Sequence, residues 1–461
     1  MEIPKNEKWA WVLGGGTSGE SAGRLLKTEG YSCILFDKNQ NQSLIWEKTF
    51  SDSEIPENLE KPSFLVKSPG ISPEHKILKF AKKTGIAVLS EIDLGRKKYS
   101  KKIIGITGTD GKSTTTSLTY HLVSKDFPEA CVGGNLGAAF TSLPLEKTNL
   151  AVLELSSYQL EDSKPLNLDC SAILNLAPDH LERHKTMENY AKAKLKIVNS
   201  NDPAHVFVTK LETLKSLFTD RSAFSCDLKL VGYTEDSDAY ILPEEKRILT
   251  KNYAYSFLNF SLSGKHNIEN LAFSILLAES VGAIPESIQT QIESFVGLPH
   301  RFETIGEYKG WKFINDSKST NIHSCLSGLN GFTRKDLLLL ILAGIPKAED
   351  PEPLFEKLLE LEPLVLHVGK PSTDWEPWLE KAGANRFEKL SECMLWIKNH
   401  LAEIENSKQS DSSFPQNSIA SKTAASTQKV VLFSPAGASF DQYKNFEERG
   451  NDLKKIFLNH F

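Results

Sequence analysis

The chain has 461 residues, which is enough for roughly three domains of about 150 residues each. Hydrophobic residues make up 40% of it and charged residues 25%, which is ordinary for a globular enzyme. The net charge of -5 excludes a broad basic surface for nucleic acid, so any anionic ligand has to be bound by local groups.

The cysteines and the apolar runs indicate a cytoplasmic protein without membrane insertion. No two cysteines form a CxxC pair, so neither a zinc site nor a disulfide framework is indicated. The longest apolar run, DLLLLILAG at 336–344, is too short to span a bilayer and is typical of a buried strand. The opening MEIPKNEKWAWVLGGG has no apolar run of the kind that a signal peptide or anchor needs.

Short apolar runs alternate with amphipathic helical stretches in three blocks, which predicts an α/β protein with parallel sheets and helical crossovers. We place the domains at residues 1–98, 99–298 and 299–461. The Ser-, Gln-, Asn- and Thr-rich tract at 405–428 has almost nothing to bury and is predicted to be a disordered surface insertion.

The first block opens with a strand, the glycine loop GGGTSGES at 14–21, a helix and a second strand. Gly14, Gly16 and Gly19 have GxGxxG spacing, and Asp37 ends the second strand about twenty residues later. Taken alone, this pattern is typical of an NAD-dependent dehydrogenase, and a plain glycine turn is the simpler interpretation.

The second block opens with KKIIGITGTDGKSTTT, a strand followed by a glycine loop and a helix. This order is the context that a phosphate-binding loop requires, although Ile106 stands where a Walker A loop has its first glycine. Gly108 and Gly111 let backbone N–H groups approach phosphate, Lys112 can bridge the terminal phosphates, and a hydroxyl of Ser113 or Thr114 can reach Mg²⁺. Asp110 should point outward or towards a metal.

Two later strands of this block end on polar side chains, at Glu154 and before His180. Parallel strands present such groups at one sheet edge, where Glu154 can bind Mg²⁺ or can simply be a solvated carboxylate. His180 and His184 have the i, i+4 spacing of zinc ligands, but no HExxH pattern or cysteine supports zinc. We therefore expect His184 to be a surface residue.

Lys194 lies at the centre of the apolar stripe of the predicted helix TMENYAKAKLKIVN. An unpaired buried ammonium is costly, so this lysine has to reach solvent, find a partner or be modified. From the helical pattern alone, reaching solvent is the simplest outcome.

Eight motifs together resemble the Mur ligase family of peptidoglycan synthesis, in order across all three blocks. Within that family the chain is most similar to the ligases that add D-glutamate. The shortened phosphate loop is itself shared with these enzymes and with the folylpolyglutamate synthetases. The motifs are TGTDGKST, LELSSYQLE, NLAPDHLERH, YAKAKLKI, GKHNIENLAF, GLPHRFE, INDSKSTN and SPAGASFDQYKNFEERG.

The resemblance implies that ATP phosphorylates the carboxylate of UDP-N-acetylmuramoyl-L-alanine and that the amine of D-glutamate displaces the phosphate. The implied catalytic residues are Lys112, His180 and Lys194, with Lys194 carbamylated as in this family. The implied Mg²⁺ ligands are Ser113, Glu154, His180 and, once carbamylated, Lys194. The implied ATP-binding residues are Gly108, Thr109, Asp110, Gly111, Lys112, Ser113, Thr114, Asn135, Asn267, Arg301 and Asp316.

The resemblance also implies a Rossmann-like first domain, a central P-loop ATPase domain and a Rossmann-like third domain. Asn135 can alternatively serve a turn, Asn267 a helix cap, and Arg301 with Asp316 a structural ion pair. The implied ligands of the uridine diphosphate are Thr17, Ser18, Asp37, Ser68 and Gly70. The implied ligands of D-glutamate are Lys318, Thr320, Lys347, Ser439, Phe440 and Phe446.

We therefore expect a monomeric, ATP- and Mg²⁺-dependent ligase that uses no NAD. The alternatives are a sibling ligase for L-alanine, L-lysine or diaminopimelate, a folate-type glutamyl ligase, a dehydrogenase, and a nucleotide-gated protein without turnover. The phosphate loop and Glu154 have no role in hydride transfer, which disfavours the dehydrogenase.

Overall fold

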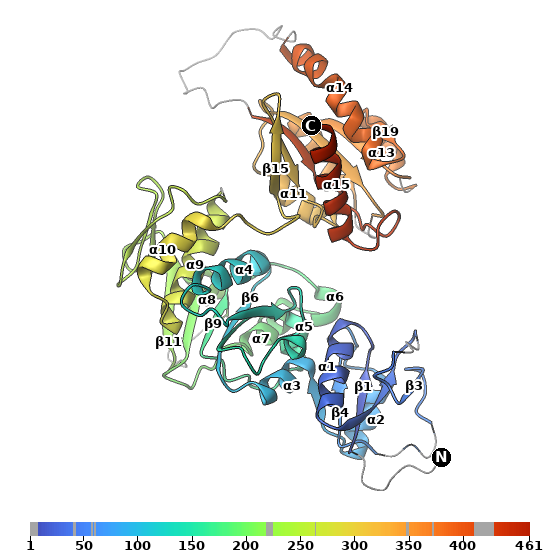
Figure 1. The fold of residues 1–461 in the computed structure, drawn as a ribbon, viewed down its shortest axis with the longest axis vertical. Coiled ribbons are helices and arrows are strands. Elements are labelled where there is room, and N and C mark those ends of the chain that lie inside the picture. The colour runs from blue at the N-terminus through green and yellow to red at the C-terminus, as the bar shows by residue number, and fades with distance from the viewer. Residues whose placement is uncertain are drawn as a thin grey trace. The chain divides into compact units, whose positions relative to one another are not determined.

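The computed structural model describes residues 8–39, 43–56, 59, 61–217, 225–262, 264–346, 350–370, 373–409 and 428–461. The chain divides into two compact units, Met1–Val296 and Gly297–Phe461. Figure 1 shows the β-sheets of the two units: the first unit holds two sheets and the second holds one.

The first sheet is wholly parallel and has the strand order β3-β2-β1-β4-β5. Its central strand is apolar on both faces, because Ala10 and Val12 pack with one core and Trp9 and Trp11 with another. Helices on both sides of a parallel sheet produce this pattern. The elements are β1 (Lys8–Leu13), α1 (Thr17–Thr28), β2 (Tyr31–Phe36), β3 (Lys48–Phe50), β4 (Phe64–Lys67), α2 (Lys76–Thr84), β5 (Val88–Ser90) and α3 (Glu91–Lys98).

Helix α3 joins the first sheet to the second. It starts with a capping box between Ser90 and Asp93, and it places Leu94 in a core of the first sheet and Ile92 in a core of the second. Gly95 lies so close to Phe140 that an added Cβ would be 2.3 Å from the ring. This shared packing explains why both sheets belong to one compact unit.

The second sheet has the order β14-β13-β12-β11-β10-β9-β6-β8-β7. Its strands are parallel from β7 to β12, and β13 and β14 add an antiparallel edge. The strands are β6 (Lys102–Thr107), β7 (Cys131–Gly134), β8 (Leu150–Glu154), β9 (Cys170–Ile173), β10 (Val206–Lys210), β11 (Asp227–Gly232), β12 (Ala239–Leu242), β13 (Arg247–Leu249) and β14 (Ala254–Ser256).

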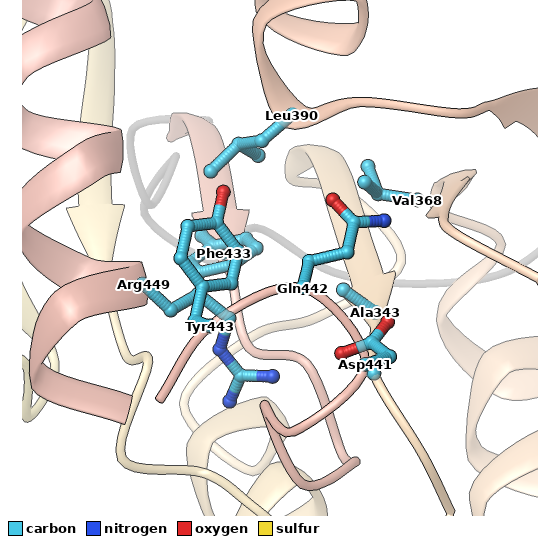
Figure 2. A pocket seen from close by; sticks show the side chains of 9 residues that line it. Ala343, Val368, Leu390, Phe433, Asp441, Gln442, Tyr443 and Arg449 are labelled. Atoms are coloured by element: carbon cyan, nitrogen blue, oxygen red, sulfur yellow. The ribbon is translucent and has the colours of Figure 1, made fainter. Parts of the chain in front are cut away.

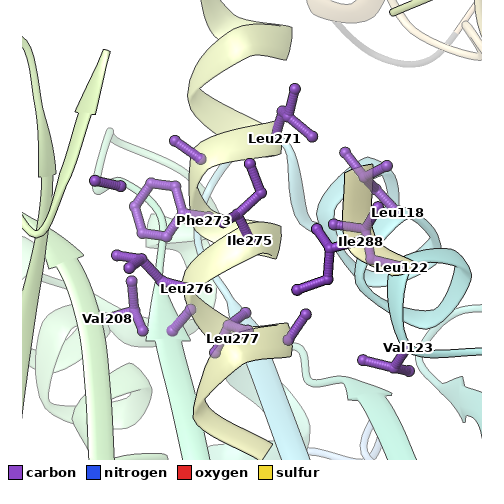
Figure 3. Packing of buried hydrophobic residues seen from close by; sticks show 14 of the residues in the cluster. Leu118, Leu122, Val123, Val208, Leu271, Phe273, Ile275, Leu276, Leu277 and Ile288 are labelled. Carbon is purple, nitrogen blue, oxygen red and sulfur yellow. The ribbon is translucent and has the colours of Figure 1, made fainter. Parts of the chain in front are cut away.

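The two faces of this sheet carry different helices. Figure 3 shows one face, where Leu118 of α4 and Ile288 of α10 pack around Leu271 and Ile275 of α9. Burying each such side chain stabilises the fold by about 1.5–3 kcal/mol. The other face packs against α3, η1, α5, α7 and α8. The helices are α4 (Lys112–Val123), η1 (Phe140–Ser142), α5 (Ser157–Asp162), α6 (Leu181–His184), α7 (Met187–Leu195), α8 (Leu211–Leu217), α9 (Lys265–Val281) and α10 (Pro285–Ser294).

The third sheet, in the second unit, has the order β15-β16-β20-β17-β18-β19 and is parallel except for the β15–β16 pair. One face packs against α11 to α13 and the other against α14 and α15. The elements are β15 (Glu303–Tyr308), β16 (Trp311–Asn315), α11 (Ile322–Leu329), β17 (Leu337–Ala343), α12 (Glu352–Leu361), β18 (Leu364–Val368), α13 (Glu376–Lys381), β19 (Asn385–Phe387), α14 (Leu390–Gln409), β20 (Lys429–Phe433) and α15 (Phe446–His460).

The predicted α/β class with mostly parallel sheets is confirmed. The predicted disordered tract at 405–428 starts too early, because α14 continues through Gln409. Residues 410–427 lie outside the described residues. No helix in the described ranges is both long enough and apolar enough to cross a membrane.

Candidate functional site

The phosphate loop joins β6 to α4 at the carboxyl edge of the second sheet. Gly111 precedes the helix with a φ of 79°, a left-handed conformation that favours glycine, and an added Cβ would lie 2.6 Å from Asn270 Oδ1. The helix therefore starts with its backbone N–H groups at the loop, where an anion can be bound. The order of strand, glycine loop and helix is the predicted one, and phosphate binding by this loop stays a prediction.

Asn175 holds this loop in place through hydrogen bonds, and the sequence did not predict this role. Its Oδ1 accepts hydrogen bonds from the backbone N–H groups of Thr109 (3.0 Å) and Asp110 (2.9 Å), and its Nδ2 donates to the Asp110 carbonyl at 3.2 Å. Thr109 Oγ1 also accepts from the Ala177 N–H at 3.0 Å. The only available signal was a polar residue directly after the apolar run SAIL.

Two lysines donate to the same carbonyl oxygen of the loop. Lys112 Nζ lies 2.9 Å and Lys194 Nζ 2.7 Å from the oxygen of Gly108. Lys194 comes from α7, is 1% exposed, and has its Nζ 4.5 Å from the centre of the Tyr190 ring. It therefore does not reach solvent, which was the simplest expectation from the helical pattern.

Burial and, second, the charge of Lys112 lower the pKa of Lys194 to about 7, although Asp179, Asp110 and Glu154 act in the opposite direction. A substantial fraction of its amine is therefore neutral at neutral pH. A neutral amine is nucleophilic, whereas the ammonium is not.

Glu154 ends β8 and is 2% exposed, so it is not the solvated carboxylate of the simpler interpretation. Its Oε1 accepts a hydrogen bond of 2.6 Å from Asn135 Nδ2, and Oε2 is buried without a hydrogen-bond partner. A buried carboxylate oxygen without a donor suits a hard cation such as Mg²⁺. Asn135 orients this carboxylate rather than serving only a turn.

The described residues contain no group of three or more His, Cys, Asp or Glu side chains that could hold a metal ion by itself. A cation beside Glu154 and Ser113 would therefore need further oxygen ligands from elsewhere. Mg²⁺ typically completes its coordination with water and substrate phosphates, so the residues present fit a Mg²⁺ ion that is bound together with a nucleotide.

His180 stands at the start of α6 and is half-exposed. Its ring nitrogens lie 3.4 Å from Asp179 Oδ2 and 3.5 Å from Glu182 Oε1, and its ring packs on Tyr158 with 4.9 Å between the ring centres. The two carboxylates favour a cation at this position, and a metal-binding role for His180 stays a prediction.

The surface position predicted for His184 is wrong. His184 is 3% exposed, its Nε2 lies 3.0 Å from Ser157 Oγ, and its ring packs between Tyr158 and Tyr190. Burial lowers its pKa. The four-residue helix α6 turns this side chain inward while His180 faces outward, which a spacing argument cannot resolve.

Asn267 lies in the first turn of α9, whose N-terminal cap is Gly264 without a side-chain hydrogen bond. The alternative that Asn267 caps the helix is therefore wrong. Its neighbour Asn270 donates to Asn267 Oδ1 at 3.5 Å and accepts from Thr115 Oγ1 at 3.2 Å, so this end of α9 packs on the phosphate loop and the start of α4.

The glycine loop of the first sheet has its own support. Gly14 has a φ of 92°, and an added Cβ on Gly19 would lie 1.9 Å from the Gly14 oxygen. Ser68 Oγ donates to that oxygen at 2.8 Å, and Asp37 Oδ2 accepts from the Gly15 N–H at 2.7 Å. The predicted uridine diphosphate ligands Thr17, Ser18, Asp37, Ser68 and Gly70 lie on this loop, at the start of α1 and at the two adjacent strand ends.

The second unit contains two of the predicted ATP-site residues, Arg301 and Asp316, and the predicted D-glutamate ligands. Asp316 follows β16; its carboxylate accepts from Ser434 Oγ at 2.9 Å and from the Phe302 N–H at 3.1 Å. Burial raises the pKa of Asp316 to about 7, although the charge of Arg301 opposes this.

The predicted D-glutamate ligands that the structure describes lie in the loop after β16, in the loop after β20 and at the start of α15. Lys318 Nζ lies 3.9 Å from the centre of the Phe446 ring. Ser439 is 2% exposed and Phe440 is 72% exposed. Thr320 follows in the same loop as Lys318, and Lys347 lies outside the described residues.

Comparison with known proteins assigns a family to these features. The family model described as "Mur ligase middle domain" matches residues 106–278, which include the phosphate loop, Glu154 and Lys194. Proteins named "UDP-N-acetylmuramoylalanine--D-glutamate ligase" match over the full length. The one from Leptospira borgpetersenii serovar Hardjo-bovis (strain JB197) is 46% identical, covering 100% of this chain and 99% of the relative. The one from Aquifex aeolicus is 31% identical, covering 96% and 97%.

Solved structures share the fold. UDP-N-acetylmuramate-alanine ligase MurC from Thermotoga maritima has a TM-score of 0.55 at 17% identity, covering 98% of this chain and 99% of its own. The MurF ligase from Thermotoga maritima, solved in complex with ADP, has a TM-score of 0.55 at 16% identity, covering 100% and 99%. At these identities the likeness concerns the fold alone.

Proposed function

The chain belongs to the Mur ligase family, and we propose that it is an ATP-dependent ligase that adds D-glutamate to UDP-N-acetylmuramoyl-L-alanine in peptidoglycan synthesis. The observation that carries the proposal is the full-length similarity to relatives named for this reaction, at 46% identity. The geometry of the phosphate loop supports the use of ATP.

The reaction has two steps. The lactoyl-alanine carboxylate attacks the γ-phosphorus of ATP, which releases ADP and forms an acyl phosphate. The amine of D-glutamate then attacks the acyl carbon, the C–O bond to phosphate breaks, and the amine loses a proton. Both reactants of the first step are anions, so catalysis depends chiefly on positioning and charge neutralisation.

The residues of the second sheet supply that neutralisation. Lys112, now 2.9 Å from the Gly108 oxygen, would contact the β- and γ-phosphates, and the N–H groups at the start of α4 would bind phosphate oxygens. Ser113 and Glu154 would hold one Mg²⁺ and His180 would help to hold a second. Bound there, Mg²⁺ supplies Lewis-acid stabilisation of the transferring phosphoryl group. The remaining predicted ATP ligands are Asn135, Asn267, Arg301 and Asp316.

Lys194 is proposed to be carbamylated. Its pKa of about 7 provides the neutral amine that attacks CO₂, and the product is an anion that removes the buried positive charge beside Lys112. Mass spectrometry under CO₂-saturated, non-acidic conditions should show that Lys194 gains the mass of one CO₂. Full activity of Lys194→Ala in CO₂-depleted, chloride-free buffer would contradict the proposal.

The three sheets are proposed to be three domains, at residues 1–98, 99–298 and 299–461. The first, Rossmann-like, would bind the uridine diphosphate with Thr17, Ser18, Asp37, Ser68 and Gly70; the second is the P-loop ATPase domain. The third, also Rossmann-like, would bind D-glutamate with Lys318, Thr320, Lys347, Ser439, Phe440 and Phe446. The enzyme is proposed to be a cytoplasmic monomer that uses no NAD.

The decisive experiment measures phosphate release from ATP and Mg²⁺ in the presence of UDP-N-acetylmuramoyl-L-alanine. D-glutamate is compared with L-glutamate, L-alanine, L-lysine and diaminopimelate. Release with D-glutamate alone is the expected result. Release with another amino acid would assign a sibling ligase, and the absence of release with all five would favour a nucleotide-binding protein without turnover.

A further inference from the structure

Arg449 of α15 is a buried charge that the proposed reaction does not yet use. It is 1% exposed and lines a small pocket of the second unit together with Asp441, Gln442 and Tyr443. Figure 2 shows the Arg449 side chain beside Tyr443 among the residues that line this pocket. Burying a charge of this size is costly unless its hydrogen-bond geometry serves a purpose.

The guanidinium connects two loops. Its Nε donates to Ser317 Oγ at 3.1 Å and its Nη2 donates to the Ser317 carbonyl at 2.8 Å, while its Nη1 donates to the Gly437 carbonyl at 3.0 Å. Ser317 Oγ in turn donates to the Phe446 carbonyl at 2.8 Å. The planar guanidinium therefore links Ser317 to the Gly437 loop and, through the Ser317 hydroxyl, to the first residue of its own helix, Phe446.

Each of these segments carries predicted ligands of D-glutamate. Ser317 directly precedes Lys318, Gly437 lies two residues before Ser439, and the Phe446 ring supports the Lys318 ammonium at 3.9 Å. The guanidinium thus holds the backbone beside the lysine and the backbone beside the serine at a fixed separation. A small dicarboxylate needs its cationic and hydroxyl partners at such a fixed separation.

The local backbone shows why such a support is needed. Ala436 has a φ of 56°, a left-handed conformation that costs free energy in a residue with a Cβ. An added Cβ on Gly437 would lie 2.6 Å from the Ala343 oxygen, and one on Gly344 would lie 2.8 Å from Arg449 Nη1. The loop before Ser439 is therefore strained and tightly packed, and Arg449 binds its carbonyl at the strained point.

An ion pair does not explain the burial of Arg449. Within the described part of the chain, its guanidinium forms no salt bridge, and it donates hydrogen bonds to one hydroxyl and two backbone carbonyls. Asp441 is the carboxylate that acts on it, at longer range, and burial lowers the pKa of Arg449 to about 10. The group stays protonated at neutral pH.

We propose that Arg449 is the positioning residue of the amino-acid subsite: its guanidinium fixes the separation between the Lys318 loop and the Ser439 loop, and so sets the affinity for the two carboxylates of D-glutamate. The proposal rests on the proposed function, because it takes D-glutamate as the substrate of this unit. It requires the directional geometry of the guanidinium and not its charge alone.

The test compares Arg449→Met with Arg449→Lys and with the control Arg334→Met. Arg334 is an exposed arginine of the same unit, paired with Glu362. We expect KM for D-glutamate to rise on the order of 10²-fold in Arg449→Met, because loop misplacement by about 1 Å has effects of this size. KM for the UDP substrate should stay within about twofold, and KM for ATP should rise less than KM for D-glutamate, because Asp316 directly precedes Ser317. Arg449→Lys should restore less than about a tenth of the loss, since one ammonium cannot span both loops.

A purely structural role predicts a different result. A destabilised enzyme contains fewer active molecules, so its apparent kcat falls while all three KM values stay unchanged. A lower kcat with unchanged KM values would overturn the proposal. So would an equal rise of all three KM values, or full rescue by Arg449→Lys.

If Arg449→Met does not fold, Ser317→Ala carries the test, because it removes only the hydroxyl that links Arg449 Nε to the Phe446 carbonyl. We expect about a threefold to tenfold higher KM for D-glutamate, the size of one lost hydrogen bond. An unchanged KM would overturn the proposal.

A second measurement separates this proposal from the proposed function. Hydrogen exchange of the backbone amides at Gly437–Ser439 should be at least about tenfold faster in Arg449→Met and in Arg449→Lys than in Arg334→Met, whichever amino acid the wild-type enzyme accepts. If D-glutamate is not the substrate, the proposed function is wrong. The hydrogen exchange and the KM for the amino acid that is accepted then still test whether Arg449 positions the two loops. Unchanged exchange would overturn the proposal.

Discussion

At the scale of single residues, the phosphate loop is defined by charges that are buried near one another. Lys112 and Lys194 donate to one carbonyl oxygen, and Glu154 keeps one carboxylate oxygen without a hydrogen-bond donor. Each arrangement costs free energy in the ligand-free protein. The groups of the proposed site should therefore have a measurable effect on the free energy of unfolding of the ligand-free protein.

Lys194 should make stability depend on pH. The unfolded chain keeps this amine protonated up to about pH 10.5, and the folded protein only up to about pH 7. Between these values the unfolded state binds more protons, so stability rises with pH; below pH 7 both states are protonated and the full cost remains. We expect the free energy of unfolding to rise between pH 7.5 and 9 by up to about 1.4 kcal/mol per pH unit more in the wild type than in Lys194→Met.

The measurement is urea unfolding in CO₂-depleted buffer without Mg²⁺. Lys192→Met is the matched control, because Lys192 is an exposed lysine of the same helix, paired with Glu188. Equal slopes for the wild type and Lys194→Met would show that Lys194 is not neutral in the folded protein.

Glu154→Gln should separate metal binding from folding. The amide keeps the size of the side chain but removes the negative charge that suits Mg²⁺. We expect ATP-dependent turnover to fall on the order of 10²-fold and more Mg²⁺ to be needed for half-maximal rate. The free energy of unfolding should not fall, because the amide leaves no buried negative charge to desolvate. Glu146→Gln, at an exposed position, is the control; a Mg²⁺ requirement unchanged in Glu154→Gln would contradict this role.

At the scale of elements, different glycines of the loop between β1 and α1 are expected to matter for folding and for binding. An added Cβ on Gly19 would collide with the Gly14 oxygen at 1.9 Å, whereas one on Gly16 meets nothing within 4 Å and Gly16 has a φ of -69°. We expect Gly19→Ala to lower the free energy of unfolding by at least about 2 kcal/mol, and Gly16→Ala to change it by less than about 0.5 kcal/mol.

Gly16→Ala should nevertheless weaken binding of the UDP substrate, measured by calorimetry, because its methyl group would stand where the diphosphate approaches the loop. Unfolding in urea provides the stability values. Equal stability of the two variants would mean that the close contact at Gly19 relaxes without cost.

At the scale of the whole molecule, every hydrophobic core cluster of the described residues draws its members from one compact unit. We therefore expect residues 297–461 to fold when expressed alone, with a cooperative urea transition, because a sheet with helices on both faces has a complete core. A fragment of residues 337–461, which lacks β16 beside β20, should not fold. Circular dichroism and near-ultraviolet spectra provide the measurement, and an unfolded 297–461 fragment would contradict the prediction.

The sequence by itself determined the α/β class, the positions of the glycine loops and the family. Alternating apolar runs and glycine spacing are local patterns. The buried face of a strand and the start of a helix can be predicted from residues that are close together in the sequence. The stripe around Lys194 was visible for the same reason. Gly19 likewise stands out by its spacing from Gly14 and Gly16.

Only the tertiary structure decided which polar groups meet. Asn175 and Arg449 act on backbone groups that are far away in sequence, 65 residues away for Asp110 and 132 for Ser317, so no local pattern shows which groups they bind. His184 was misplaced and the early part of the tract at 405–428 proved helical, because burial and helix length depend on what packs against a segment. Long-range hydrogen bonds and burial are properties of the folded chain. Sequence spacing can therefore predict a site, but it cannot identify the residues that hold the loops of that site in place.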